Sequence, residues 1–311
     1  MKGQNLLNAG FLFLMLSALL MGCSDNNDQE ARDQEIKLLQ KYLEDNNITE
    51  EPTESGLYYI PISEGTGNQV GLYYIVDFEY VVELLDGTVL FTSYEDVAIS
   101  HNVYRDDVMY GPIRLKAGNT GVPGLDEGLL LMKEGEKAKL IMPSNINGFG
   151  ASSTALSPPY STHIYTVDML HAFDDPETFE IGQINDYLVE HQIDSVYTTP
   201  SGLIYIEEVA GVGDLIKDGD EVSVWYTGTY LDGRVFDSNL DGQAMIIQMP
   251  AVTAAGYIPA WDEALKLMRE GTQAKIIIPY DLAYGEDGWG SIPPYMTLVF
   301  DMEIKDVISY E

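Results

Sequence analysis

The chain has a single cysteine and few basic residues. Because Cys23 stands alone among 311 residues, no disulfide can form within the chain, and the fold must depend on packing. Lysine and arginine number 16 against 50 acidic residues, which gives a formal net charge of −34. This charge repels nucleic-acid phosphates and anionic membrane surfaces, and no basic patch offsets it. We therefore expect no nucleic-acid partner, and we interpret the acidity as favouring solubility in an exposed compartment.

Long apolar runs are absent beyond the N-terminus, so we expect no transmembrane helix there. Lys2 precedes an apolar run at 11–21, which is shorter than the roughly 20 residues that span a bilayer. A basic start, a short apolar stretch and a small residue before a cleavage point describe a secretory signal. The ending Leu-Met-Gly-Cys at 20–23 resembles a bacterial lipobox. We predict a lipoprotein signal peptide at 1–22 and lipidation of Cys23, with an ordinary signal peptide and an incidental cysteine as the alternative.

The segment that follows this cysteine is polar, acidic and without periodicity. We predict that residues 23–34 form a flexible tether. Acidic residues directly behind a lipidated cysteine are similar to surface-export signals in some Bacteroidetes lipoproteins. These features predict a cell-envelope protein that is lipid-anchored and extracytoplasmic, periplasmic or at the cell surface. Its contact with a membrane would be through the lipid anchor only.

The rest of the chain contains an internal repeat. Each copy begins with a short amphipathic helix whose apolar residues recur at intervals of three and four, at 35–48 and again at 180–193. A strand follows each helix, and matching segments continue to the end of both copies. We predict two tandem domains, 35–175 and 176–311, joined near Asp174-Asp175-Pro176, where a proline behind two acids is typical of a linker.

Strand-like alternation dominates each copy. Apolar residues alternate along 222–226 and then meet Asp232-Gly233, which is a hairpin signal. One helix is expected to begin near Pro259 and to end before Gly271. Strands packed with one short helix predict an α+β fold class.

The most specific signal is a series of aromatic-rich blocks in the second copy. They are Val222–Gly228, Asp232–Ser238, Tyr257–Glu263, Leu282–Gly285 and Ile292–Pro294. Aromatic residues recur at the ends of periodic segments with one acid among them, which predicts an apolar pocket with a single polar corner. In this order the blocks resemble the FKBP-type peptidyl-prolyl cis-trans isomerases. The resemblance implies that each domain is a curved antiparallel β-sheet wrapped around a short α-helix, with the pocket between them.

The resemblance also implies an activity and its partners. The expected reaction is cis-trans isomerisation of X–Pro bonds in exported proteins, so the expected partners are proline-containing polypeptide clients. A tacrolimus-type ligand is expected to fit the C-terminal pocket. The barrier to rotation about the amide is about 18–20 kcal/mol, and a dry apolar pocket favours the twisted amide over the planar one. Such a reaction requires no nucleophile, metal or cofactor, and we expect none.

Matching positions give the expected site residues. The catalytic residues would be Tyr226, Asp237 and Tyr284. Asp237 would accept a hydrogen bond from Tyr226 and place negative charge near the twisting amide, while Tyr284 would donate its hydroxyl. The substrate-binding residues, which would surround the proline ring, are Phe236, Ile258, Trp261, Ile292 and Phe300. The departures from the family pattern include Ala260 before the tryptophan, Tyr257 in place of a smaller residue, and a shortened loop that contains Trp289.

The first copy has lost much of this pattern. Its matching residues, if one residue is inserted before Phe91, are Tyr80, Phe91, Thr92, Val122, Leu125, Phe149, Ser157 and Tyr165. The acid, the tryptophan floor and the tyrosine donor are then missing, which predicts a degenerate domain with a binding or spacing role. The alternative for the whole chain is a non-catalytic binding module or holdase chaperone on the cell envelope. A surface interaction protein that uses the fold only as a scaffold is a third possibility.

Metal-binding patterns are weak. The run from Asp237 to Gly242 fits the first half of a calcium loop, but Gln248 stands where a bidentate glutamate is needed. The four histidines are scattered without ligand spacing, and we expect them at the surface. They are His101, His163, His171 and His191. We therefore expect no metal site.

Overall fold

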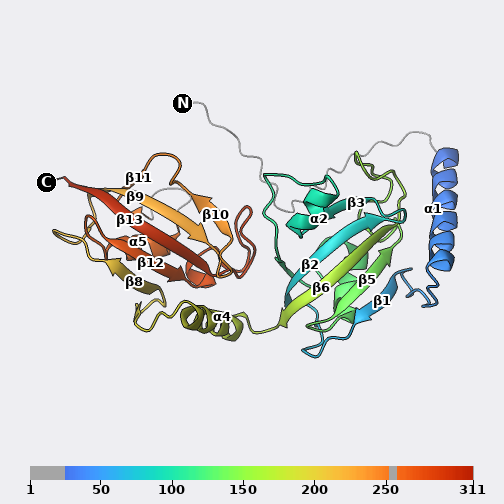
Figure 1. Cartoon of the computed structure of the whole chain (residues 1–311), viewed down its shortest axis with the longest axis horizontal. Coiled ribbons are helices and arrows are strands. Elements are labelled where there is room, and N and C mark those ends of the chain that lie inside the picture. The colour runs from blue at the N-terminus through green and yellow to red at the C-terminus, as the bar shows by residue number, and fades with distance from the viewer. Residues whose placement is uncertain (1–24, 252–257, 311) are drawn as a thin grey trace. The chain divides into compact units, whose positions relative to one another are not determined.

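The computed structural model describes residues 25–251 and 258–310, which fall into two compact units (Figure 1). Unit 1 is Met1–Asp174 and unit 2 is Asp175–Glu311. The predicted signal peptide, Cys23 and Tyr257 lie outside the described residues. Within the described residues, no helix is long and apolar enough to span a bilayer.

Unit 1 is an antiparallel sheet with a helix packed against its apolar face. The strands lie in the order β1-β5-β6-β2-β3, and β4 pairs with β2. Helix α3 buries Leu125 and Leu129 in the core that these strands share. The elements are α1 (Asp25–Asp45), β1 (Tyr58–Ser63), β2 (Ile75–Leu84), β3 (Val89–Thr92), α2 (Glu95–Ser100), β4 (Ile113–Lys116), α3 (Pro123–Leu131), β5 (Lys137–Met142) and β6 (His163–Phe173).

Unit 2 repeats this topology. Its strands lie in the order β10-β9-β13-β12-β8-β7, with β11 paired to β9, and all the pairings are antiparallel. Its elements are α4 (Pro176–Glu190), β7 (Tyr197–Thr198), β8 (Ile204–Val209), β9 (Asp220–Thr229), β10 (Val235–Ser238), β11 (Met245–Gln248), α5 (Pro259–Leu265), β12 (Gln273–Ile278), the 3₁₀ turn η2 (Tyr280–Leu282) and β13 (Leu298–Ser309). The predicted α+β class is confirmed.

The first helix of each unit is attached by a buried glutamate to segments that directly adjoin strands of its own unit. Each carboxylate accepts one hydrogen bond from a backbone N–H and one from a threonine hydroxyl, at 2.5–3.0 Å. The carboxylates and these partners are Glu35 with Ser144 and Thr162, and Glu180 with Tyr280 and Thr297. Because a buried carboxylate without partners is strongly destabilising, these bonds fix where each helix sits on its sheet.

Both helices begin earlier than predicted. Helix α1 starts at Asp25, so 25–34 is helical and the prediction of an unstructured tether is wrong for these residues. Acidic residues near a helix N-terminus stabilise the helix by interacting with its macrodipole, and no proline or glycine interrupts the segment. Helix α4 starts at Pro176 because the Asp175 side chain accepts a hydrogen bond from the Thr178 N–H at 3.1 Å. Two of the three residues that we predicted as linker, Asp175 and Pro176, therefore cap and begin a helix.

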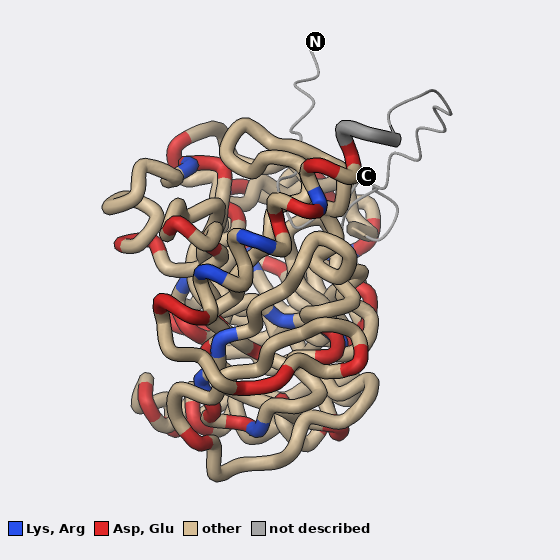
Figure 2. Tube along the Cα trace, turned by 90° about the vertical axis from the view of Figure 1, so that its right-hand side faces the viewer, with Lys and Arg blue, Asp and Glu red and all other residues tan. Residues whose placement is uncertain are grey.

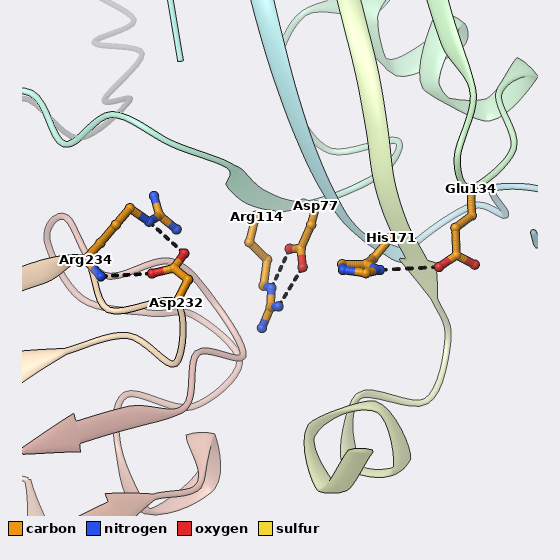
Figure 3. A network of polar contacts seen from close by, with 6 residues as sticks. All are labelled: Asp77, Arg114, Glu134, His171, Asp232 and Arg234. Carbon is orange, nitrogen blue, oxygen red and sulfur yellow. Dashed lines mark hydrogen bonds and ion pairs between the residues drawn. The ribbon is translucent and has the colours of Figure 1, made fainter. Parts of the chain in front are cut away.

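A buried ion pair holds β4 to β2 in unit 1 (Figure 3). Arg114 donates two hydrogen bonds to the Asp77 carboxylate, at 2.6 and 2.7 Å, and the two residues are direct partners in the strand register. Both residues are less than 10% exposed, and the guanidinium also lies 5.4 Å from the centre of the Phe173 ring. Removing one partner of such a pair leaves an uncompensated buried charge, so the pair specifies where the short strand docks.

His163 contradicts the expectation that the histidines lie at the surface. It is the first residue of β6 and is fully buried. Its Nε2 lies 2.9 Å from the Ser157 hydroxyl, and the Phe149 ring packs against it at 4.7 Å. Burial lowers the pKa of His163 from 6.5 to about 4, because the imidazolium would lose its hydration. The corresponding residue of unit 2 is Leu298, the first residue of β13, and this apolar position explains the burial.

We expect unit 1 to lose stability as the pH falls from about 6.5 to about 4. The unfolded chain takes up a proton on His163 in this range and the folded chain does not, so the native state loses up to about 3 kcal/mol. Replacing His163 by leucine should flatten this part of the pH dependence, whereas replacing the exposed His101 should leave it in place. Hydrogen exchange of the β6 amides in the full chain measures the effect. An unchanged slope in His163→Leu would contradict it.

Candidate active site

Four aromatic rings from four elements meet in unit 2. Tyr226 of β9, Trp261 of α5 and Phe300 of β13 are each about 5% exposed, and Phe236 of β10 is half-buried. The centre of the Phe300 ring lies 5.1 Å from that of Trp261, 5.5 Å from that of Phe236 and 5.9 Å from that of Tyr226. The Tyr226 and Trp261 rings are 5.0 Å apart at an interplanar angle of 85°. These edge-to-face contacts fix the rings relative to one another.

A carboxylate borders this ring cluster. The Tyr226 hydroxyl donates a hydrogen bond of 2.7 Å to Oδ2 of Asp237, as predicted. The neighbouring Phe236 contacts the same cluster, although adjacent side chains of a regular strand point to opposite faces. A β-bulge explains this arrangement, because the register of β10 against β9 shifts between Val235 and Asp237. The bulge brings one aromatic and one acidic side chain to the same site.

Tyr284 lies beside this acid. Its side chain is half-buried, and burial raises the pKa of its phenol, with a further contribution from the negative charge of Asp237. The Trp289 ring stacks on Tyr284 with 6.4 Å between the ring centres and an interplanar angle of 16°. The structure thus brings Tyr284 to the charged border of the ring cluster rather than into its centre.

The two predicted aliphatic residues, Ile258 and Ile292, are both buried. Ile258 is 4% exposed and directly precedes α5, whose first residue is Pro259. Ile292 is 9% exposed and exchanges backbone hydrogen bonds with Trp289, at 2.9 and 3.0 Å. Ile258 therefore flanks the helix that carries Trp261, whereas Ile292 lies in the loop that carries Trp289.

Sequence reasoning did not give Gly228 a role. A Cβ atom there would lie 2.6 Å from Cζ of Phe236 and 2.9 Å from Cε1 of Phe300, far inside van der Waals contact. The absence of a side chain lets the two rings close over the strand. A glycine within an alternating strand is the signal for such a close approach.

Tyr230 was also missed. It is 2% exposed, and its ring stacks on Phe236 with 5.2 Å between centres. Burial raises the pKa of its phenol to about 12, and its hydroxyl donates to the Ser291 carbonyl at 3.4 Å. Tyr230 continues the alternation of residues 222–226, so the period-2 pattern was its signal.

The register of unit 1 corrects the predicted match between the copies. Phe91 pairs with Val82, as Asp237 pairs with Gly228, and both short strands carry a bulge at the preceding residue. Phe91 therefore occupies the position of the carboxylate, and no inserted residue is needed. Our match of Phe91 to Phe236 is wrong, since Leu90 stands there.

These replacements change the character of the unit 1 site. A phenyl ring stands at the acid position and a valine at the glycine position, so both positions carry apolar side chains in unit 1. The Phe91 ring lies 6.1 Å from Tyr165 and 6.2 Å from Tyr80. Burial raises the pKa of the Tyr165 phenol, whose hydroxyl has no hydrogen-bond partner among the described residues. Phe91 cannot accept a hydrogen bond from Tyr80 in the way that Asp237 accepts one from Tyr226.

Each unit is an α+β domain in which a sheet packs against a short helix, and unit 2 adds the ring cluster. Comparisons with known proteins identify the family to which such domains belong. The family model for FKBP-type peptidyl-prolyl cis-trans isomerases matches residues 67–170 and 213–305, one region in each unit. The chain belongs to this family, and the predicted tandem arrangement is confirmed.

The chain matches each of these relatives over one region only. A probable FKBP-type peptidyl-prolyl cis-trans isomerase of Haemophilus influenzae is 46% identical over 114 residues, which cover 36% of this chain and 45% of the relative. The isomerase FkpA of Escherichia coli K12 is 42% identical over 113 residues, 36% of this chain and 40% of the relative. The matched region is thus less than half of each relative. The crystal structure of FkpA from Escherichia coli aligns at 37% identity and a TM-score of 0.37, over 42% of this chain and 59% of that one.

We expect Gly228→Ala to disrupt the ring cluster. The added methyl group would overlap Phe236 and Phe300 and destabilise unit 2 by about 1–3 kcal/mol. Gly242→Ala is the matched control, because a Cβ there would meet nothing closer than 3.6 Å. All three tryptophans of the chain lie in unit 2, so tryptophan fluorescence during thermal unfolding reports on this unit. Equal midpoints for the two variants would refute the steric role of Gly228.

Proposed function

We propose that the protein is a peptidyl-prolyl cis-trans isomerase that acts on X–Pro bonds of exported proteins, with its active site in unit 2. The observation that carries this proposal is the Tyr226–Asp237 hydrogen bond at the edge of four packed rings. Membership of the isomerase family supports the reaction class. The phenyl ring at the acid position of unit 1 favours unit 2 as the active copy.

The proposed mechanism needs only a dry site and oriented dipoles. Rotation about the X–Pro bond passes through a twisted amide that has lost its resonance and much of its charge separation. The rings of Tyr226, Phe236, Trp261 and Phe300 would hold the proline ring away from water, which lowers the energy of the twisted amide relative to the planar one. Asp237, oriented by the Tyr226 hydroxyl, would place negative charge beside the twisting bond.

The flanking residues would then position the peptide. The backbone N–H of Ile258 would donate to a substrate carbonyl, the Tyr284 hydroxyl would donate to a second one, and Ile292 would close the far side. A tacrolimus-type ligand would occupy the same site. Unit 1 would serve as a binding or spacing domain, because its aromatic and valine replacements fill the corresponding space.

The competing function is a holdase or binding module that grips exposed apolar segments without turnover. It would use the same rings, but it would not depend on the charge of Asp237. The two functions therefore differ in how a change at Asp237 affects rate and binding.

Tyr226→Phe and Asp237→Ala should each reduce kcat/KM for isomerisation of a proline peptide. Loss of this hydrogen bond is worth about 1.4 kcal/mol, or roughly tenfold in rate. Tyr80→Phe, the same substitution at the matching position of unit 1, should retain the activity of the unchanged chain. A protease-coupled isomerisation assay on the full chain measures all three. If the unchanged, folded chain gives only the spontaneous rate, the isomerase proposal fails and the binding module replaces it.

We also propose that the protein is anchored in the cell envelope by lipid on Cys23 and meets its clients there. The lipobox-like ending at residues 20–23 supports this location. Cys23→Ala should abolish incorporation of a labelled fatty acid in cells that process lipoproteins, because the acceptor thiol is gone. A Cys23→Ala chain that still takes up label would overturn the anchor.

A further inference from the structure

Trp289 is a large side chain that no role proposed so far explains. It is 67% exposed, whereas Trp261 of the ring cluster is 4% exposed. The loop that carries it is constrained, because Trp289 and Ile292 exchange two backbone hydrogen bonds. Gly288 precedes it with φ +69°, and a Cβ there would lie 2.3 Å from the Ile292 carbonyl oxygen. The indole is thus presented to solvent by a defined turn.

The indole extends the site outward. The indole stacks on Tyr284, and the negative charge of Asp237 contributes to the raised pKa of the Tyr284 phenol. A substrate whose proline lies against the ring cluster would therefore carry its flanking residues past this indole. The faces of an indole attract cations more strongly than those of the other aromatic side chains.

The same loop is acidic. Glu286 and Asp287 are exposed and directly precede Gly288 in the loop. Glu286 accepts a hydrogen bond of 2.8 Å from the Tyr295 hydroxyl, and burial together with these two carboxylates raises the pKa of Tyr295 to about 12. The loop therefore maintains a negative potential beside the indole.

Unit 2 supplies little positive charge to neutralise this loop. Figure 2 shows acidic positions along much of the described trace and far fewer basic ones, in keeping with the net charge of −34. Several basic side chains of unit 2 already form ion pairs with other carboxylates of the unit. They are Arg234, Lys266, Lys275 and Lys305.

We propose that Trp289, Glu286 and Asp287 form a subsite for a lysine or arginine side chain that flanks the proline of a client. The cation would lie over the indole face, with the two carboxylates nearby. Opposite charge at the rim of a site also raises the rate of encounter. This inference rests on the proposed isomerase function of unit 2, and it assigns that site clients with basic residues beside proline.

Kinetics on matched peptides test the subsite. The full chain is assayed with proline peptides that differ only in one flanking residue, which is lysine, leucine or glutamate. We expect kcat/KM for the lysyl peptide to exceed that for the glutamyl peptide by about tenfold at low salt, since a cation over an aromatic ring and one exposed ion pair each contribute about twofold to fivefold. The ratio should shrink when the ionic strength is raised, because the Debye length falls to about 10 Å at 0.1 M.

Variants separate the ring from the charge. Trp289→Ala should lower the lysyl-to-glutamyl ratio by about twofold to fivefold, and Trp289→Phe should restore part of it. Glu286→Gln with Asp287→Asn should lower the ratio and its salt dependence. The control, Glu208→Gln with Asp306→Asn, removes two exposed charges from strands β8 and β13. It should leave the ratio near that of the unchanged chain.

The remaining outcomes are decisive. A ratio that Trp289→Ala leaves unchanged, or a preference for the leucyl peptide that does not respond to salt, would overturn the basic subsite. If no peptide is isomerised, the proposed function fails separately. Calorimetric titration of the lysyl and glutamyl peptides into the full chain and into Trp289→Ala then decides the subsite: a lysyl preference that the variant loses sustains it, and no such preference ends it.

Discussion

The site of unit 2 depends on one backbone irregularity, the bulge in β10 opposite Gly228. A regular strand would turn either Phe236 or Asp237 away from the cluster. The bulge brings both toward it, and the missing side chain at Gly228 leaves room for the rings of Phe236 and Phe300. The hydrogen bond from Tyr226 then fixes the acid. Ring walls and a single charge thus come from two consecutive residues, which is how so small a domain combines an apolar site with a polar corner.

The two units share a fold and differ at the positions of this site. They share sheet order, strand register and the bulge itself. Unit 1, however, has Phe91 at the position of Asp237 and Val82 at the position of Gly228. Unit 1 therefore has two apolar side chains where unit 2 has a carboxylate and a glycine that the rings of Phe236 and Phe300 cover. Burial of His163 beside Ser157 adds a polar pair to that interior, where unit 2 has a leucine.

Much of this was predictable from the sequence, and the exceptions have physical causes. Alternation and turn residues predicted the α+β class, and the family resemblance of the ordered blocks implied the contact between Tyr226 and Asp237. The match of Phe91 failed because residue type favoured aligning two phenylalanines. The ungapped match of Asp86-Gly87 with Asp232-Gly233 already aligns Phe91 with the acid, as the hydrogen-bond register does. The burial of His163 was missed because a single histidine carries no periodicity, and only the apolar residue at the matching position indicates its environment.

The glutamate that attaches each first helix to its sheet has a historical consequence. The family model matches from residue 67 in unit 1 and from residue 213 in unit 2, so both helices lie outside the matched regions. Nevertheless both helices carry a glutamate whose carboxylate accepts hydrogen bonds from a backbone N–H and a threonine hydroxyl beside the strands of its own unit. One origin before duplication explains this shared contact with fewer events than two independent origins. We infer that the segment that duplicated already included this helix and was longer than the region that the family model matches.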